Sequence, residues 1–85
     1  MKQVEIYTTP FCGFCARAKH LLDQKGVAYS EIDVWSDRTA RAVMTERAEG
    51  RRTLPQIFIG NEGIGGCDEL HALERQGALD TMLAS

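Results

Sequence analysis

Apolar and polar positions follow two different periods along the chain, and each change of period marks a new element. Residues 3–8 (QVEIYT) alternate with a period of two, which predicts a strand. Apolar positions recur at helical spacing over residues 14–25, and Gly26 then suits the end of a helix. Residues 27–34 (VAYSEIDV) are rich in β-branched and aromatic side chains, which predicts a second strand.

The middle of the chain repeats this alternation. A second amphipathic helix is predicted between a cap at Ser36 or Asp37 and a stop at Gly50. Residues 56–60 (QIFIG) predict a third strand. The turn NEG leads from it to a short fourth strand at residues 64–66, so that the two strands form a hairpin.

A last helix is predicted from Asp68 to Gly77, followed by one turn of apolar residues that closes onto the core. The order is therefore β-α-β-α-β-β-α, in the α/β class and in a single domain spanning residues 1–85. The first βαβ unit should be parallel with a right-handed crossover. Since the hairpin adds an antiparallel pair, we expect a mixed four-stranded sheet flanked by helices.

Charge and length exclude several classes of protein. The 10 basic and 12 acidic residues of the 85 are interspersed, so there is no basic stripe for nucleic acid and no polybasic patch for a membrane. The pair Arg51-Arg52 is an exception, and a solvated pair is the simpler interpretation. No signal peptide and no apolar stretch of about 20 residues is found, so we expect a cytoplasmic protein.

Two of the three cysteines form the motif Cys12-Gly-Phe-Cys15 at the start of the first helix. Unpaired N–H groups and the helix dipole favour a thiolate at this place, and only the thiolate is a nucleophile. Cys15 follows one turn later on nearly the same face, where it can attack a mixed disulfide formed on Cys12. A redox pair is therefore the preferred interpretation.

Two alternatives to a redox pair exist. Both cysteines could be buried without chemistry, although a helix start after a Pro-containing loop is an exposed place. Alternatively, Cys12 and Cys15 could bind zinc together with Cys67 and His71. These zinc ligands would have to come from two helix starts, and a chain with such clear periodicity needs no metal to fold.

Two further segments favour binding of an extended peptide. In TLPQIF, Pro55 precedes a strand, and a cis Leu54–Pro55 bond would leave the backbone of Leu54 free to pair with a peptide. In GGCDEL, the glycines before a helix start allow a carboxylate to approach the backbone N–H groups. Asp68 could cap this helix or bind an ammonium group. An ordinary hairpin exit followed by a capped helix explains the second segment equally well.

These motifs together make the whole chain similar to the glutaredoxins, and most of all to the bacterial dithiol type. The resemblance implies a thioredoxin-like fold and a glutathione-dependent thiol–disulfide oxidoreductase. It would reduce protein disulfides and protein–glutathione mixed disulfides, with Cys12 as nucleophile and Cys15 as resolving thiol. The family resemblance also implies a monomer, and no metal on the isolated chain. A further alternative is a thioredoxin-like carrier that is reduced by a flavoenzyme. The GGCD motif favours a glutathione-dependent protein over this alternative.

The resemblance also implies a glutathione-binding groove. Leu54 would pair its backbone with the cysteinyl unit, Pro55 would be cis, and Phe14 would flank the groove. Cys67 and Asp68 would hold the γ-glutamyl end, through a backbone amide and a carboxylate respectively. The expected glutathione-binding residues are Phe14, Thr53, Leu54, Pro55, Gly66, Cys67 and Asp68.

The chain departs from the family pattern around the nucleophile. Gly13 and Phe14 stand where dithiol glutaredoxins usually have Pro and Tyr, and Thr9 replaces a frequent lysine. Proline would stiffen the first helical position, whereas glycine allows the loop to flex or to approach a partner subunit. This suggests a second hypothesis, a [2Fe-2S] cluster bridging two subunits through Cys12 and a glutathione from each.

Overall fold

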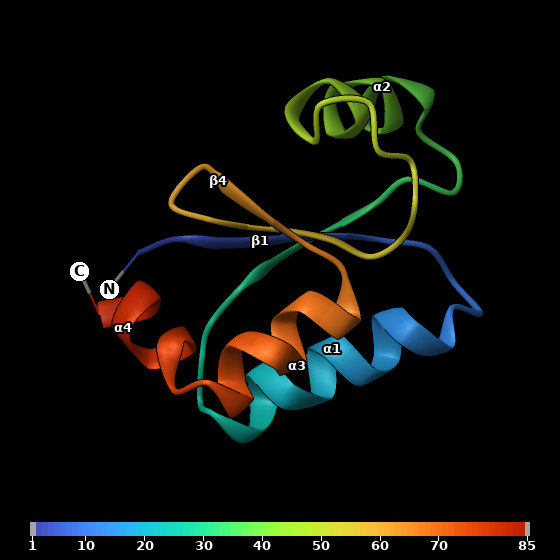
Figure 1. Cartoon of the computed structure of the whole chain (residues 1–85). Helices are drawn as coiled ribbons and strands as arrows, with labels where there is room; N and C mark the ends of the chain where they lie inside the picture. Colours follow the sequence, from blue (N-terminus) through green and yellow to red (C-terminus); the bar gives the residue numbers. More distant parts are fainter. Residues whose placement is uncertain (1, 85) are drawn as a thin grey trace.

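The computed structural model describes residues 2–84, and these residues form eight elements around one sheet (Figure 1). The elements are β1 (Val4–Thr8), α1 (Gly13–Gln24), β2 (Ser30–Asp33), α2 (Arg38–Arg47), β3 (Gln56–Ile59), β4 (Glu62–Gly65), α3 (Cys67–Arg75) and α4 (Ala78–Ala84). The predicted order is confirmed for the first seven, and α4 is added at the end.

The sheet is mixed and four-stranded, as predicted. Its strand order is β2-β1-β3-β4. β1 pairs with β2 in parallel, whereas β3 pairs antiparallel with both β1 and β4. Because β1 is central, the loop at its C-terminal end lies beside the segments that follow β2 and precede β3. This loop carries the Cys-x-x-Cys motif.

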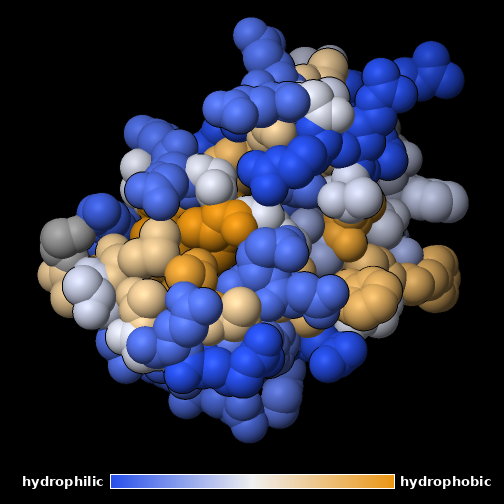
Figure 2. Space-filling model, viewed as in Figure 1, coloured by the Kyte–Doolittle hydropathy of each residue, from blue (hydrophilic) through white to orange (hydrophobic). Residues whose placement is uncertain are grey.

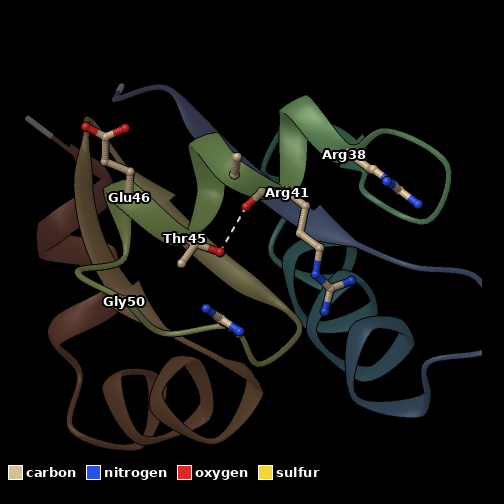
Figure 3. A pocket seen from close by; sticks show the side chains of 7 residues that line it. Arg38, Arg41, Thr45, Glu46 and Gly50 are labelled. Atoms are coloured by element: carbon tan, nitrogen blue, oxygen red, sulfur yellow. Dashed lines mark hydrogen bonds between the residues drawn. The ribbon is translucent and has the colours of Figure 1, made fainter.

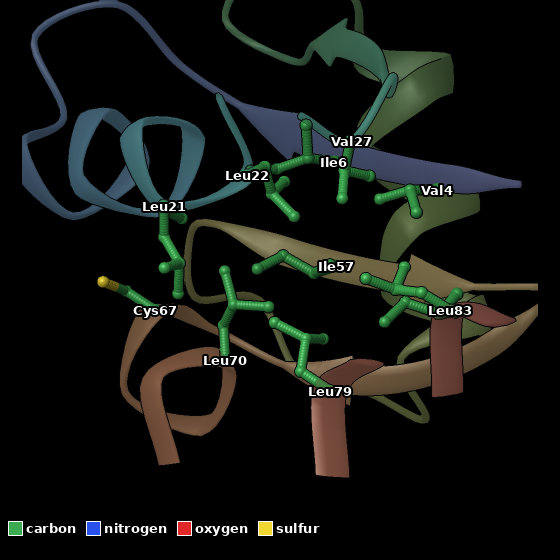
Figure 4. Close-up of a cluster of buried hydrophobic side chains, with 12 residues drawn as sticks. Val4, Ile6, Leu21, Leu22, Val27, Ile57, Cys67, Leu70, Leu79 and Leu83 are labelled. Atoms are coloured by element: carbon green, nitrogen blue, oxygen red, sulfur yellow. The ribbon is translucent and has the colours of Figure 1, made fainter. Parts of the chain in front are cut away.

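Helices cover both faces of the sheet. α2 lies on one face, and α1, α3 and α4 lie on the other (Figure 1). The larger core fills the space between the sheet and these three helices, with Val4 and Ile6 of β1 directed into it (Figure 4). Tyr7 belongs instead to the smaller core under α2. The alternation in residues 3–8 thus divides the side chains of β1 between the two faces.

Arg47 fastens α2 to the sheet. Its guanidinium donates to the Glu5 carboxylate at 2.9 Å and to the Tyr7 hydroxyl at 2.8 Å. The same group lies 4.1 Å from the centroid of the Phe58 ring. Its stem and head are therefore part of the packing of the smaller core, and they are not a free surface charge.

Several boundaries differ from the prediction. β2 begins at Ser30, because the chain at Val27 is still tied to α1 by a bond from the Val27 N–H to the Leu22 carbonyl. β4 begins at Glu62 instead of residue 64. The segment after Gly77 is a helix of seven residues and not a single turn. No helix within residues 2–84 has the length and apolar character to span a bilayer.

Candidate active site

Cys12 is the N-cap of α1, which is the position that the sequence predicts for a nucleophile. Its Sγ accepts a hydrogen bond from the Cys15 backbone N–H at 3.2 Å, and its carbonyl accepts from the Ala16 N–H. The thiol is half-buried and remains reachable from solvent. The sulfur therefore lies at the positive end of the helix, beside a backbone donor.

Cys15 has the opposite environment. Its side chain is 1% exposed. Burial, together with the hydrogen bond to Cys12, raises its pKa to about 12. All three cysteines are free thiols, so the Cys12–Cys15 pair is in its reduced form. One accessible and one buried thiol three residues apart is the asymmetry that a nucleophile and a resolving thiol require.

The loop before α1 presents two exposed aromatic rings around Cys12. Phe11 is fully exposed and has a φ of +64°, which is unusual for a bulky residue. Phe14 is exposed by 54%, and the Arg17 guanidinium lies 6.0 Å from its ring centroid. Figure 2 shows apolar atoms at the edge of the molecule where Figure 1 places the start of α1. The nucleophile is thus bordered by apolar surface.

A hollow of about 140 Å³ lies beside this loop and joins three segments of the chain. It is lined by Phe14, Thr53, Leu54, Pro55, Gly66, Cys67, Asp68 and Glu69. The first seven are the residues that the family resemblance implies for glutathione. The Leu54–Pro55 peptide bond is cis, as expected. Within residues 2–84, no hydrogen bond uses the backbone of Leu54.

The start of α3 forms one wall of the hollow, and here the predicted cap is wrong. Gly66, not Asp68, is the N-cap, and its N–H donates to the Glu69 carboxylate at 2.7 Å. Glu69, at the third position of the helix, thus binds the N–H of the N-cap residue, and Asp68, one possible cap, is left exposed in the first turn. A Cβ on Gly66 would lie 3.1 Å from the Pro55 carbonyl oxygen, so glycine permits the close approach of these two segments.

Cys67 is buried, and this burial raises its pKa. Its sulfur points away from the surrounding core side chains (Figure 4) and lies 3.5 Å from Nδ1 of His71. That ring nitrogen also lies 2.9 Å from the Cys67 carbonyl oxygen. Within residues 2–84, no three His, Cys, Asp or Glu side chains are grouped to hold a metal ion. The zinc alternative therefore has no support.

Residues that sequence reasoning missed support the same region. Gln56 is 1% exposed, and its amide nitrogen donates to the carbonyl and hydroxyl oxygens of Thr53 at 3.0 and 2.9 Å. It thereby fixes the loop before Leu54. The signal in the sequence for this role was a polar residue at the first position of an otherwise apolar strand. Trp35, which follows β2, is exposed by 70%.

A separate hollow of about 530 Å³ lies against α2 (Figure 3). It is lined by Arg38, Arg41, Ala42, Thr45, Glu46, Gly50 and Arg52. The Thr45 hydroxyl donates to the Arg41 carbonyl at 2.9 Å within the helix. No lining residue carries a thiol, so this surface lacks the chemistry of the Cys12 loop.

Fold and site together define a class of protein. A reachable thiol caps the first helix, a buried thiol follows three residues later, and a cis-proline loop stands beside the pair. All three are carried on a mixed four-stranded sheet with helices on both faces. This combination defines a thiol–disulfide oxidoreductase with a thioredoxin-like fold.

Comparison with known proteins identifies the family. Residues 4–64 match the glutaredoxin family. Glutaredoxin 3 of Escherichia coli K12 is 48% identical over 83 residues, covering 98% of this chain and 99% of that protein. A glutaredoxin of Pseudomonas aeruginosa is 49% identical over the full length of both chains. The chain belongs to the glutaredoxin family.

Solved structures agree with this assignment. The solution structure of a Brucella melitensis glutaredoxin is 54% identical, with a TM-score of 0.85 over 98% of this chain and 89% of that one. A buckwheat glutaredoxin–glutathione complex is 34% identical, with a TM-score of 0.87 over 96% of this chain and 76% of that one. The predicted fold is confirmed. So is the predicted activity: the protein is a dithiol, glutathione-dependent thiol–disulfide oxidoreductase.

Proposed function

We propose that Cys12 carries the exchange reaction and that Cys15 is required only where a protein disulfide is reduced. With a glutathionylated protein, the Cys12 thiolate attacks the glutathione sulfur and the protein leaves as a thiolate. A second glutathione thiolate then attacks the Cys12–glutathione disulfide, which yields glutathione disulfide and restores Cys12. With a protein disulfide, Cys12 forms a mixed disulfide with the substrate, and Cys15 displaces the substrate from Cys12.

The observation that carries this proposal is the difference between the two thiols. Cys12 is half-buried and accepts an N–H bond at a helix start, whereas Cys15 is buried with a raised pKa. A group in the second environment cannot begin the exchange at neutral pH, because it is almost entirely protonated. It can complete the exchange once the Cys12 sulfur becomes an electrophile beside it.

The hollow beside the loop provides complementary groups for glutathione. The unused backbone of Leu54 can pair with the cysteinyl unit in the manner of an added strand. The first N–H groups of α3, from Cys67 onward, suit the γ-glutamyl carboxylate, and the exposed Asp68 carboxylate suits its ammonium group. The related buckwheat protein was solved as a complex with glutathione, which supports glutathione as the ligand.

A pair of assays tests these roles. Cys12→Ser should abolish the reduction of both a glutathionylated peptide and a protein disulfide in a glutathione-coupled assay. Cys15→Ser should retain the first activity and lose the second. Arg75→Met, which changes one exposed side chain at the end of α3, is the control and should retain both activities. Turnover of either substrate by Cys12→Ser would overturn the assignment.

A second function, the binding of a [2Fe-2S] cluster between two subunits, rests on the surroundings of Gly13. A Cβ at this position would meet no atom within 4 Å, so the space beside Cys12 is open to a partner. One structure that is 52% identical is titled "Metal Binding of Glutaredoxins". Cys12 of each subunit, with a glutathione from each, would hold the cluster. Anaerobic reconstitution with iron, sulfide and glutathione should give a coloured dimer; a colourless monomer would refute it.

The proposed partners are glutathione and disulfide-containing or glutathionylated proteins, encountered by a monomer. The cytoplasm is the proposed setting, because its glutathione pool both keeps thiols reduced and supplies the reductant. Re-reduction of the oxidised protein by glutathione alone would separate this role from that of a carrier reduced by a flavoenzyme.

A further inference from the structure

A second hollow, which we call the β2-side hollow, touches both active-site thiols. It measures about 480 Å³ and is lined by Thr8, Thr9, Pro10, Phe11, Cys12, Gly13, Cys15, Ala16, Lys19, Glu31 and Asp33. Its charged groups come from α1 and β2. None of them has a part in the exchange reaction described above, so their effect on the thiols is a separate question.

Lys19 is held in a fixed place in this hollow. Its ammonium nitrogen lies 3.0 Å from the Glu31 carboxylate. The same carboxylate oxygen accepts a hydrogen bond of 2.7 Å from the Thr8 hydroxyl, and Thr8 is 2% exposed. The buried hydroxyl fixes the carboxylate, and the carboxylate fixes the ammonium group. Lys19 is thus paired at a partly exposed site, and the pairing narrows the set of rotamers that its side chain samples.

Cys15 and Lys19 are four residues apart on α1, so their side chains lie on the same face of the helix. A backbone hydrogen bond at Thr9 and, after it, the Lys19 charge lower the pKa of Cys15 and so oppose the effect of burial. Two of the contributions that raise this pKa come from Cys12, its hydrogen bond and its charge. When Cys12 is joined to glutathione it has no thiol or thiolate left. Burial then remains the main cause that raises the pKa of Cys15, and the Lys19 charge opposes it.

We propose that Lys19, oriented by Glu31 and Thr8, is a positioning residue for the resolving step, acting by stabilising the Cys15 thiolate. This rests on the proposed roles of the two cysteines. The Cys15 thiol loses its proton to water in the β2-side hollow, and the resulting thiolate attacks the Cys12 sulfur. The Cys12–Cys15 bond forms as the Cys12–glutathione bond breaks, and glutathione leaves as a thiolate that takes up a proton.

The remaining charged groups of the hollow do not replace Lys19. The Glu31 carboxylate already accepts from two donors, which hold it as an anion and make it a poor base. The Thr8 hydroxyl and Lys19 lower the pKa of Glu31 accordingly. Asp33 lies on β2, and its carboxylate accepts the Trp35 N–H at 2.7 Å. Lys19 is the one cation among the residues that line the hollow.

The test separates the two chemical steps in one experiment. Reduced protein is mixed in a rapid-quench instrument with glutathione disulfide that carries a fluorophore on each half, acid stops the reaction at set times, and the fluorescent thiol is separated from the protein and counted. Attack by Cys12 releases the first equivalent of fluorescent thiol, and attack by Cys15 releases the second. Cys15→Ser should release one equivalent only. Absence of the first release would refute the proposed role of Cys12, whatever the effect of Lys19.

Lys19→Met should leave the first release unchanged and slow the second about two- to fivefold at pH 7, which is the range expected for the loss of one partly exposed charge interaction. The pH profile of the second release should move to higher pH, and Lys19→Arg should restore most of the rate. Arg75→Met, which removes one exposed cation at the end of α3, is the control and should change neither release.

Three results would overturn the proposal. The second release could be unaffected by Lys19→Met, or both releases could slow equally with no movement of the pH profile, which would indicate a purely structural effect. In the third, Glu31→Gln would slow the second release more than Lys19→Met does, which would make Glu31 a general base. We expect Glu31→Gln to have the smaller effect, because the cation remains on the helix.

Discussion

The most quantitative prediction concerns the order in which the three thiols react with iodoacetamide. Burial and the bond to Cys12 raise the pKa of Cys15 to about 12. At pH 7 its thiolate fraction is then about one in 100,000, against about 3% for an unperturbed cysteine with a pKa of ~8.5. The thiolate of a weaker acid is intrinsically more nucleophilic. With a Brønsted coefficient of ~0.4–0.5, the rate constant of the Cys15 thiolate is therefore about 25- to 55-fold higher than that of an unperturbed thiolate.

Cys15 should therefore react about 50- to 120-fold more slowly than a free cysteine, before steric access is considered. At 1% exposure its sulfur is also shielded from the reagent, and Cys67 is buried with a raised pKa as well. Cys12 alone is half-buried at a helix start. We expect a single adduct on the native protein.

The assay is alkylation of the reduced protein at pH 7 with limiting reagent, quenched over time and mapped by mass spectrometry of peptides. Cys12 should be fully modified before any adduct is found at Cys15 or Cys67. In denaturing urea all three should react at similar rates, which shows that the fold causes the difference. An adduct at Cys15 while Cys12 is still free would refute the assigned roles.

Two further predictions concern the scaffold. Arg47→Met should lower the free energy of unfolding by about 2 kcal/mol, because it leaves Glu5 without its charged partner and removes the stacking on Phe58. Urea titration measures this change, and a decrease of less than ~0.5 kcal/mol would mean that the contacts are unimportant. Phe11→Asn should raise the free energy of unfolding by about 0.5–1 kcal/mol, since asparagine tolerates a φ of +64° and the fully exposed ring has no packing to lose. A decrease in thermal denaturation temperature would contradict this second expectation.

The parts of the site that sequence could predict are the local ones. Cys12 and Cys15 lie within one loop and one helical turn, so their spacing and the helix start determine how they are presented. The order of the elements along the chain and the mixed sheet followed from the same kind of periodicity, together with the rules for parallel connections. The hollow joins three distant segments, and its residues were expected only because the motifs resemble those of a known family.

The details that sequence missed depend on tertiary packing. Asp68 suited a helix cap by its chemistry, but Glu69 reaches back to the Gly66 N–H and takes that role. The seven residues of α4 show only weak periodicity, and their helix is stabilised by burial of Leu79 and Leu83 in the larger core. The Lys19–Glu31 pair is likewise invisible in the sequence, because parallel pairing of β1 and β2 creates it.

The most direct test of the central claim is to locate glutathione on the protein. Cys15→Ser can be trapped as its Cys12–glutathione mixed disulfide and compared with the reduced form by ¹H–¹⁵N NMR. The largest amide shifts outside the Cys12 loop are predicted at Leu54, Cys67 and Asp68, around the hollow beside α3. Shifts concentrated at Arg41 and its neighbours on α2, with none at Leu54 or Cys67, would contradict the assigned binding site.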